Sequence, residues 1–229
     1  VAGSEAAFIL AEKGFRVVVF DQKNLPYGKI EDGLPKWHIG LRNKEEKKID
    51  DRLSHPNIRF VPGVRLGRDT TLDELAIDWG FSAVIIAIGA WLDRKLPVEG
   101  IDKLRNNGLI YQNDLLYWYN HRHEADYTGS DYSLPDGTCV IGGGLASIDV
   151  VKMVMIEIAQ KALKAQKGID IDLFTFEKKG VAKILEENQT SLEDLGLDGC
   201  TLFYRKRVQD MPLYPRKGDS PADIEKAQR

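Results

Sequence analysis

The sequence lacks a long apolar run and a strong charge of either sign, and these two absences narrow the class of protein. No stretch approaches the roughly 18 apolar residues of a membrane-spanning helix, and no charged and then apolar leader precedes Val1. We therefore expect a soluble, cytoplasmic protein without a membrane span. The net charge of −3 at pH 7 argues against a nucleic-acid-binding protein, which needs a strongly basic face.

Cysteine and histidine are also scarce, with two and four residues respectively. Cys139 and Cys200 lie far apart and form neither a CxxC pair nor part of a metal quartet. Each stands at the start of a predicted apolar strand, so we expect buried core thiols. His121 and His123 have no third ligand at a suitable spacing. We expect them to be solvated or hydrogen-bonded, and we expect no metal site.

The composition is that of an ordinary globular protein, because 43% of the residues are hydrophobic and 29% are charged. This balance argues against disorder. A length of 229 residues suits one large domain or two small ones.

A glycine-rich stretch near the middle of the chain joins a predicted strand to a predicted helix. Gly142-x-Gly144-x-x-Ser147 matches a dinucleotide fingerprint: Gly142 permits a tight turn, Gly144 lets a pyrophosphate approach bare backbone, and Ser147 lets the helix pack closely on its strand. The helix start would then bind phosphates. The alternative is an ordinary glycine-rich turn. The residues expected to contact the cofactor are Gly142, Gly143, Gly144, Leu145 and Ala146.

The end of a second fingerprint stands at the start of the sequence. Ala2 and Gly3 lead into a predicted helix, residues 4–13, followed by a strand that ends at Phe20. Asp21 stands about 20 residues after the fingerprint, where a carboxylate binds a ribose hydroxyl. The first strand and the first two glycines of this pattern are not in the sequence. Two such units imply two dinucleotides, usually a flavin and a nicotinamide.

The second unit differs from the first at the end of its second strand. The predicted strand Cys200–Tyr204 is followed by Arg205, Lys206 and Arg207, where the first unit has Asp21. A carboxylate at this place suits a free 2′-hydroxyl, whereas guanidinium groups suit a 2′-phosphate. We therefore predict NADP in the second unit. A solvated basic loop is the alternative.

The remaining segments are predicted from periodicity and end signals. They are an amphipathic helix at 44–53, strands at 58–62 and 64–66, a Thr-capped helix at 71–77, a buried strand at 82–90, an aromatic crossover at 115–123 expected to pack between domains, a long helix at 150–166, and an insertion at 168–199 with a helix at 181–188 and a capped turn at 190–193.

Further motifs can be compared with known families. They are Asp21-x-x-x-x-Pro26-Tyr27-Gly28, the loop Gly33–His38, Gly63-Val64, Ala87-Ile88-Gly89-Ala90, Trp118-Tyr119-Asn120, and Tyr204–Arg207 followed by Asp210-Met211-Pro212. With the two fingerprints, they resemble the adrenodoxin reductase and ferredoxin–NADP reductase group, which is related to the small subunit of glutamate synthase. The resemblance covers nearly the whole chain. It does not decide between the branches, because the insertion is more similar to adrenodoxin reductase and the basic segment to glutamate synthase.

This resemblance implies an α/β fold with two Rossmann-like, three-layer dinucleotide-binding domains, both incomplete in this sequence. Residues 1–100 would hold FAD, with contacts from Ala2, Gly3, Asp21, Gly28, Val64 and Gly89. Residues 101–229 would hold NADP, with the 2′-phosphate at Arg205, Lys206 and Arg207. His38 is similar to a histidine proposed to handle a proton, although a structural role is an alternative.

The function implied is hydride transfer between NADPH and FAD, with electrons passing on to an iron–sulfur protein. Two alternatives remain. The chain could supply electrons within a larger complex such as glutamate synthase, or it could be a non-catalytic nucleotide-binding scaffold.

Overall fold

The computed structural model describes residues 1–207, 210, 211 and 220. Two compact units make up the chain, Val1–Tyr127 and Thr128–Arg229. Segment 101–127, assigned from motifs to the NADP domain, lies in the first unit by its packing. Pro212 of the expected 2′-phosphate loop lies outside the described residues, as does most of the chain after Met211.

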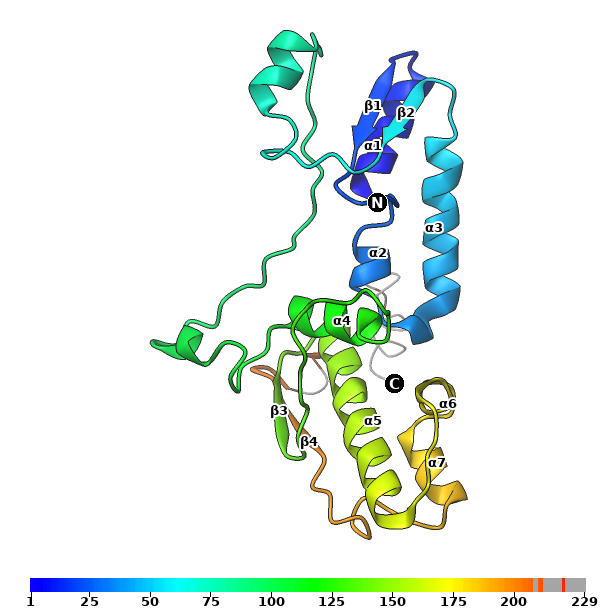
Figure 1. Cartoon of the computed structure of the whole chain (residues 1–229), viewed down its shortest axis with the longest axis vertical. Coiled ribbons are helices and arrows are strands. Elements are labelled where there is room, and N and C mark those ends of the chain that lie inside the picture. Colours follow the sequence, from blue (N-terminus) through cyan, green and yellow to red (C-terminus); the bar gives the residue numbers. More distant parts are fainter. Residues whose placement is uncertain (208–209, 212–219, 221–229) are drawn as a thin grey trace. The chain divides into compact units, whose positions relative to one another are not determined.

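The first unit contains a parallel strand pair with helices packed on it (Figure 1). Strand β1 (Val17–Phe20) pairs with β2 (Ile58–Val61) over their whole lengths. A β-branched run favours a strand, and the connection between the two strands contains helix α3 (Ile39–Leu53). Helix α1 (Ala2–Glu12) buries small side chains and contacts both strands. The expected opening helix and parallel strands are confirmed.

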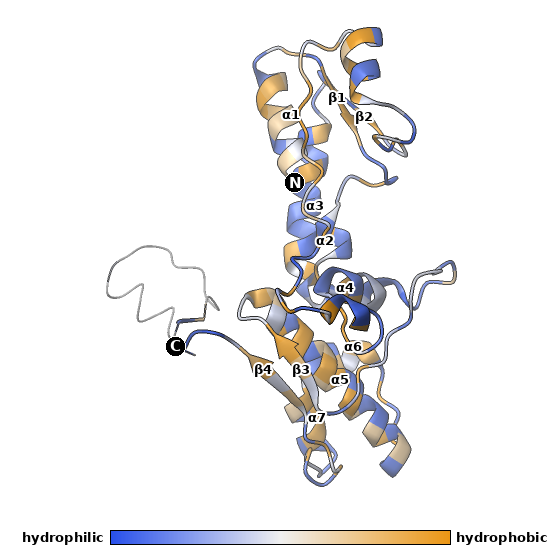
Figure 2. Cartoon of the chain, turned by 90° about the vertical axis from the view of Figure 1, so that its left-hand side faces the viewer, coloured by the Kyte–Doolittle hydropathy of each residue, from blue (hydrophilic) through white to orange (hydrophobic). Residues whose placement is uncertain are grey.

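Helix α3 begins five residues earlier than the charge pattern predicted, and it is mostly hydrophilic along its length (Figure 2). The first unit has four further short or medium elements. They are α2 (Lys29–Asp32), a 3₁₀ helix (Lys36–His38), a π-helix (Glu74–Asp78) and a 3₁₀ helix (Ile101–Leu104). Helix α4 (Gln112–His121) begins three residues before the predicted aromatic segment, covers most of it, and buries Trp118 and Tyr119.

Two expected strands of the first unit are absent. Val64 and Arg65 have no regular structure, and Leu66 forms only an isolated bridge with Thr70. Ser82–Ala90 has no regular structure, and Ile85 and Ile88 are 61% and 68% exposed. An apolar run becomes a buried strand only where a neighbouring strand accepts its backbone hydrogen bonds. Ser82–Ala90 pairs with neither β1 nor β2, so the prediction of a buried strand was wrong.

The second unit repeats the strand–helix–strand order. Strand β3 (Thr138–Ile141) pairs in parallel with β4 (Cys200–Phe203), and helix α5 (Leu145–Lys167) packs on both. Helix α5 ends at Gly168, whose φ of 67° is the left-handed conformation that glycine adopts readily. Its buried face carries Met153 and Val154 among other apolar residues. The predicted long helix and both strands are confirmed.

The insertion between α5 and β4 contains two helices, α6 (Leu173–Lys179) and α7 (Val181–Glu187). Only the second was predicted. The capped turn is formed by Ser191 and Asp194, which exchange backbone-to-side-chain hydrogen bonds of 3.1 and 2.9 Å. Thr190, the cap expected from the sequence, instead buries a hydroxyl that has no hydrogen-bond partner among the residues that the structure describes. The capping motif is therefore one residue further along than predicted.

The prediction of two buried thiols was wrong. Cys139 is exposed and Cys200 is half-buried, and both are free. The two-stranded sheet explains the difference, because α5 covers one face and Cys139 shares the other with Ile141, which is 63% exposed.

Across the part of the chain that the structure describes, no helix combines the length and apolar character needed to cross a membrane. Within the same residues, no group of three or more His, Cys, Asp or Glu side chains could hold a metal ion.

Candidate functional site

The glycine turn of the second unit joins the ends of its two strands. The Gly142 amide donates a hydrogen bond of 3.0 Å to the Phe203 carbonyl, so the turn lies beside the point where β4 ends. A Cβ added at Gly142 would lie 3.0 Å from the Ser147 Cβ. Because the turn and the helix approach so closely, only small residues fit at positions 142 and 147, as the fingerprint predicts.

Gly144 stands at the start of α5 and leaves its backbone accessible. It has φ −94° and ψ 174°, and no side chain in the described part of the chain caps the helix. A Cβ added at this position would meet nothing within 4 Å. The first N–H groups of a helix have no intrahelical acceptor, and the Leu145 and Ala146 amides are the first two of α5.

The basic segment follows directly from the end of β4. Arg205, Lys206 and Arg207 are exposed, and Arg207 Nε donates a hydrogen bond of 2.9 Å to Asp210. This bond raises the pKa of Arg207 above its usual value, so the guanidinium stays charged. Because Gly142 bonds to Phe203, the structure brings the glycine turn and the basic segment to the same edge of the sheet.

In the first unit, the structure brings Asp21 and Val64 together. The Val64 amide donates a hydrogen bond of 2.9 Å to the Asp21 carbonyl, and the Asp21 carboxylate accepts one of 2.9 Å from the Lys23 amide. Asp21 directly follows β1 at the edge where α1 begins (Figure 1). A nucleotide placed at the start of α1 would therefore meet this carboxylate at the end of the neighbouring strand.

Ala2 and Gly3 form the first turn of α1. A Cβ added at Gly3 would lie 3.4 Å from the Ala87 side chain, so the segment before Gly89 passes close to the helix start. Gly28 precedes α2 with a φ of 55°, and Gly89 has a φ of 75°. Both glycines adopt backbone conformations that other residues rarely adopt.

His38 ends the 3₁₀ helix before α3 and is half-buried. Its Nε2 accepts a hydrogen bond of 3.1 Å from the Trp37 indole. This contact orients the ring, and it suits the structural role as well as it suits proton exchange.

A buried polar cluster in the first unit was not predicted. Asp32, which is 2% exposed, pairs with Lys23 and accepts from His121 Nε2 at 3.1 Å. The other ring nitrogen of His121 bonds Glu124 at 2.9 Å and holds the pKa of that carboxyl below its usual value. The expectation that His121 is hydrogen-bonded is confirmed. Its partner Asp32 carries no sequence signal, because the pair is 89 residues apart.

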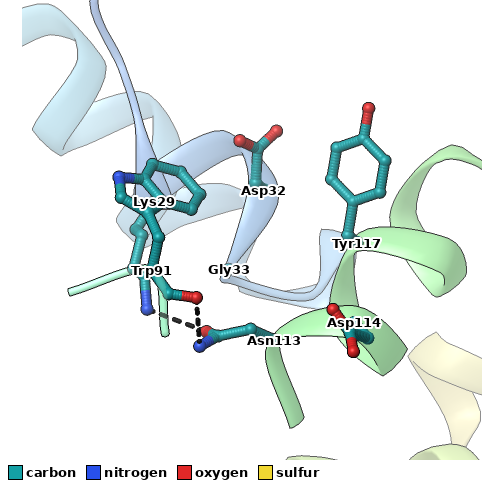
Figure 3. Close-up of a pocket in the computed structure, with 7 residues that line it drawn as sticks. All are labelled: Lys29, Asp32, Gly33, Trp91, Asn113, Asp114 and Tyr117. Carbon is teal, nitrogen blue, oxygen red and sulfur yellow. Dashed lines mark hydrogen bonds between the residues drawn. The ribbon is translucent and has the colours of Figure 1, made fainter. Parts of the chain in front are cut away.

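A pocket of about 150 Å³ lies beside this cluster, between α2 and α4 (Figure 3). The Lys29 ammonium donates to the Asn113 side chain at 2.8 Å, and Asn113 donates to the Trp91 carbonyl at 3.1 Å. Ligand pockets usually measure about 300–1,000 Å³, so this one is too small for a dinucleotide. None of the predicted cofactor-binding residues lines it.

Asn120 supports the loop that carries His38. Its side-chain amide donates hydrogen bonds to the carbonyls of Glu31, Asp32 and Leu34 at 3.2, 3.3 and 3.0 Å. These carbonyls stand at and just beyond the end of α2, where they lack helical partners. The Trp118-Tyr119-Asn120 motif therefore has a structural role that the sequence did not show.

Comparison with known proteins gave no matching family model, but it gave several relatives. The chain is 25% identical over 166 residues to a probable NADPH:adrenodoxin oxidoreductase of Schizosaccharomyces pombe, covering 70% of this chain and 34% of the relative. It is 29% identical over 159 residues to the small chain of a NADPH glutamate synthase of Mycobacterium tuberculosis, covering 67% and 31%. It is 31% identical over 147 residues to a probable ferredoxin/ferredoxin–NADP reductase of Mycobacterium leprae, covering 64% and 25%.

The resemblance to the adrenodoxin reductase and ferredoxin–NADP reductase group is confirmed. Among solved structures, the chain matches FprA, a Mycobacterium tuberculosis oxidoreductase, with a TM-score of 0.50 and 25% identity over 67% of this chain and 35% of that one. A structure of FprA in complex with NADPH matches with the same scores. The chain is thus an α/β protein similar to a dinucleotide-binding oxidoreductase, and it spans about a third of the length of the first relatives it matches.

Proposed function

We propose that this chain is part of a flavoprotein oxidoreductase that passes electrons from NADPH through FAD to an iron–sulfur protein. Two Rossmann-like domains would carry the cofactors, with FAD in 1–100 and NADP in 101–229. The adrenodoxin and ferredoxin reductases among its relatives support this reading. When bound, the flavin and the nicotinamide supply the redox chemistry, and the chain supplies binding and orientation.

The residues of the first unit fit the adenosine half of FAD. The Asp21 carboxylate follows a strand at the edge where α1 begins, which is where a ribose hydroxyl is bound in such folds. The hydrogen bond that it accepts from the Lys23 amide leaves acceptor capacity, because a carboxylate has about four lone-pair sites. Val64 is held against Asp21 by its amide and would border the adenine.

The residues of the second unit fit NADP. Uncapped amides at the start of α5 and the open space at Gly144 suit a pyrophosphate. Three exposed cations at the end of β4 suit a 2′-phosphate, which Arg binds through charge-assisted bonds. The Gly142–Phe203 hydrogen bond, which brings these two anion-binding groups to one sheet edge, is the observation that carries the proposal.

His38 is the side chain we nominate for proton exchange. It is half-buried in a loop that Asn120 fixes through the Leu34 carbonyl. A His38→Gln variant would keep a hydrogen-bonding side chain and remove the titrating group. If His38 exchanges a proton, flavin reduction should slow in this variant and its pH dependence should change.

The direct experiment is anaerobic mixing of the full-length protein with NADPH while the flavin absorbance is followed. We expect FAD to co-purify and to be bleached by NADPH faster than by NADH, and an added ferredoxin-type protein to restore the absorbance. A protein that binds both nucleotides without bleaching would be a non-catalytic scaffold, and the proposal would be withdrawn.

The relative in glutamate synthase supports a second candidate, an electron-supplying subunit of a larger complex. The two candidates differ in the acceptor. Affinity purification from the native cell, followed by mass spectrometry, would recover a stoichiometric catalytic subunit in the second case. In the first case, the full-length protein would reduce a ferredoxin-type protein alone.

A further inference from the structure

Tyr204 lies directly against the glycine turn. A Cβ added at Gly143 would overlap two carbons of the Tyr204 ring, so no residue other than glycine fits at position 143 while the ring stays in place. Tyr204 is the first residue after β4. The turn and the start of the basic segment are therefore joined twice, by the Gly142–Phe203 hydrogen bond of 3.0 Å and by this ring contact.

The other end of the Tyr204 side chain reaches the basic segment. Its hydroxyl donates a hydrogen bond of 3.2 Å to the Asp210 carbonyl. The Asp210 carboxylate in turn accepts from Arg207 Nε at 2.9 Å and from a terminal Arg207 nitrogen at 3.4 Å. One side chain thus spans from the backbone of Gly143 to the residue that orients Arg207.

We propose that Tyr204 is a positioning residue that holds the basic segment against the glycine turn and so sets the preference for a 2′-phosphorylated nucleotide. This inference rests on the proposed function of the second unit as an NADP site. The pyrophosphate and the 2′-phosphate belong to one ligand and are separated by a fixed adenosine, so both anion-binding groups must stand at matching places at once. A preformed spacing avoids ordering the loop on binding, and this raises affinity.

Two explanations of the cofactor preference can be distinguished: the placement of the basic segment by Tyr204, and the charge of that segment alone. If the cations act only through their charge, their exact placement matters little, and Tyr204 can be changed without affecting cofactor preference. If Tyr204 sets the spacing, its loss weakens NADPH and spares NADH, because NADH lacks the phosphate that the basic segment would bind.

The test compares the full-length protein with Tyr204→Phe and Tyr204→Leu, measuring the affinities of NADPH and NADH by calorimetry. Tyr204→Phe keeps the ring on Gly143 and loses one neutral hydrogen bond, so NADPH should weaken by roughly 2- to 10-fold. Tyr204→Leu loses both contacts and should weaken NADPH further. NADH affinity should stay within about 2-fold in both. Phe174→Leu, at a 69% exposed ring on α6, is the matched control and should change neither affinity.

Thermal unfolding tests the ring contact without any cofactor. Gly143→Ala should lower Tm, and the same change in a Tyr204→Ala background should cost little, because the overlapping ring is gone. An equal fall in Tm on Gly143→Ala in both backgrounds would mean that the ring does not pack against Gly143, and would overturn the inference.

The outcomes distinguish the inference from the proposed function. A wild-type protein that binds NADPH, with an unchanged NADPH-to-NADH affinity ratio in both Tyr204 variants, would overturn the inference alone. Equal weakening of NADPH and NADH would mean that Tyr204 serves only the fold, and would overturn it as well. A wild-type protein that binds neither nucleotide would remove the proposed function and this inference with it.

Discussion

The amide of Val64 donates a 2.9 Å hydrogen bond to the carbonyl of Asp21, so two residues 43 positions apart lie side by side where β1 and β2 end. The bond uses backbone atoms only, and the Asp21 carboxylate separately accepts a hydrogen bond from the Lys23 amide. A change of the carboxylate therefore tests nucleotide binding without breaking this contact.

Asp21→Asn should weaken FAD binding. Asparagine can still accept from the Lys23 amide, but the charged hydrogen bond to a ribose hydroxyl is lost. Such a bond contributes roughly 1.5–3 kcal/mol, so the Kd for FAD should rise by about 10- to 100-fold. The measurement is fluorescence titration of the deflavinated full-length protein with FAD.

The matched control is Asp51→Asn, an exposed carboxylate on α3 paired with Lys47. It should leave FAD affinity unchanged. Equal FAD affinity in Asp21→Asn and the wild type would remove Asp21 from the cofactor site.

Asn120→Ala should destabilise the first unit. The carbonyls of Glu31 and Asp32 lose a donor at a site where Asn120 is 1% exposed, whereas the Leu34 carbonyl keeps a 3.4 Å hydrogen bond from Arg42. Each buried group left unsatisfied costs roughly 1–3 kcal/mol. Urea unfolding should show the loss. Asn24→Ala, at an exposed position, should change the free energy of unfolding by less than about 0.5 kcal/mol. Similar free energies of unfolding for the two variants would mean that water replaces the Asn120 amide as the hydrogen-bond donor.

The cysteines should differ in reactivity and should both be dispensable. Burial raises the pKa of the Cys200 thiol, so at pH 8 it holds less of the reactive thiolate than an ordinary cysteine. Cys139 is exposed. Iodoacetamide should therefore modify Cys139 first, as read by peptide mass spectrometry, and Cys139→Ser with Cys200→Ser should leave turnover largely intact. Loss of flavin reduction in a folded double variant would point to a thiol relay.

Arg205→Ala and Arg207→Ala should shift cofactor preference. Losing one charge-assisted contact to a 2′-phosphate should lower kcat/KM for NADPH by about 10- to 100-fold and leave NADH nearly unchanged. Lys178→Ala, an exposed cation at the end of α6, controls for net charge. If NADPH and NADH lost activity equally, the arginines would serve the fold or a protein partner.

The sequence was most informative where the physical cause is local. The fingerprint located the turn at Gly142, because the close approach of Ser147 lies only five residues away. The β-branched runs located β1 and β3 for a similar reason. The prediction of a strand at Ser82–Ala90 was wrong because a buried strand needs a neighbouring strand to pair with. The apolar pattern does not say whether such a strand is present. The sequence did not predict the structural roles of Asn120 and Tyr204, because tertiary packing determines which residues they contact.

Gly144→Ala tests most directly the central claim that the start of α5 receives the cofactor's pyrophosphate. Its φ of −94° suits alanine, and a Cβ there meets nothing within 4 Å, so Tm should match that of the wild type. The control for binding is Gly40→Ala on α3, another position with open space, which should change neither nucleotide affinity. The new methyl group at position 144 would nevertheless occupy the approach to the backbone amides. We predict that calorimetry will show NADPH and NADH weakened together, by about 10-fold or more. Unchanged affinity for both nucleotides in a folded Gly144→Ala protein would contradict the account.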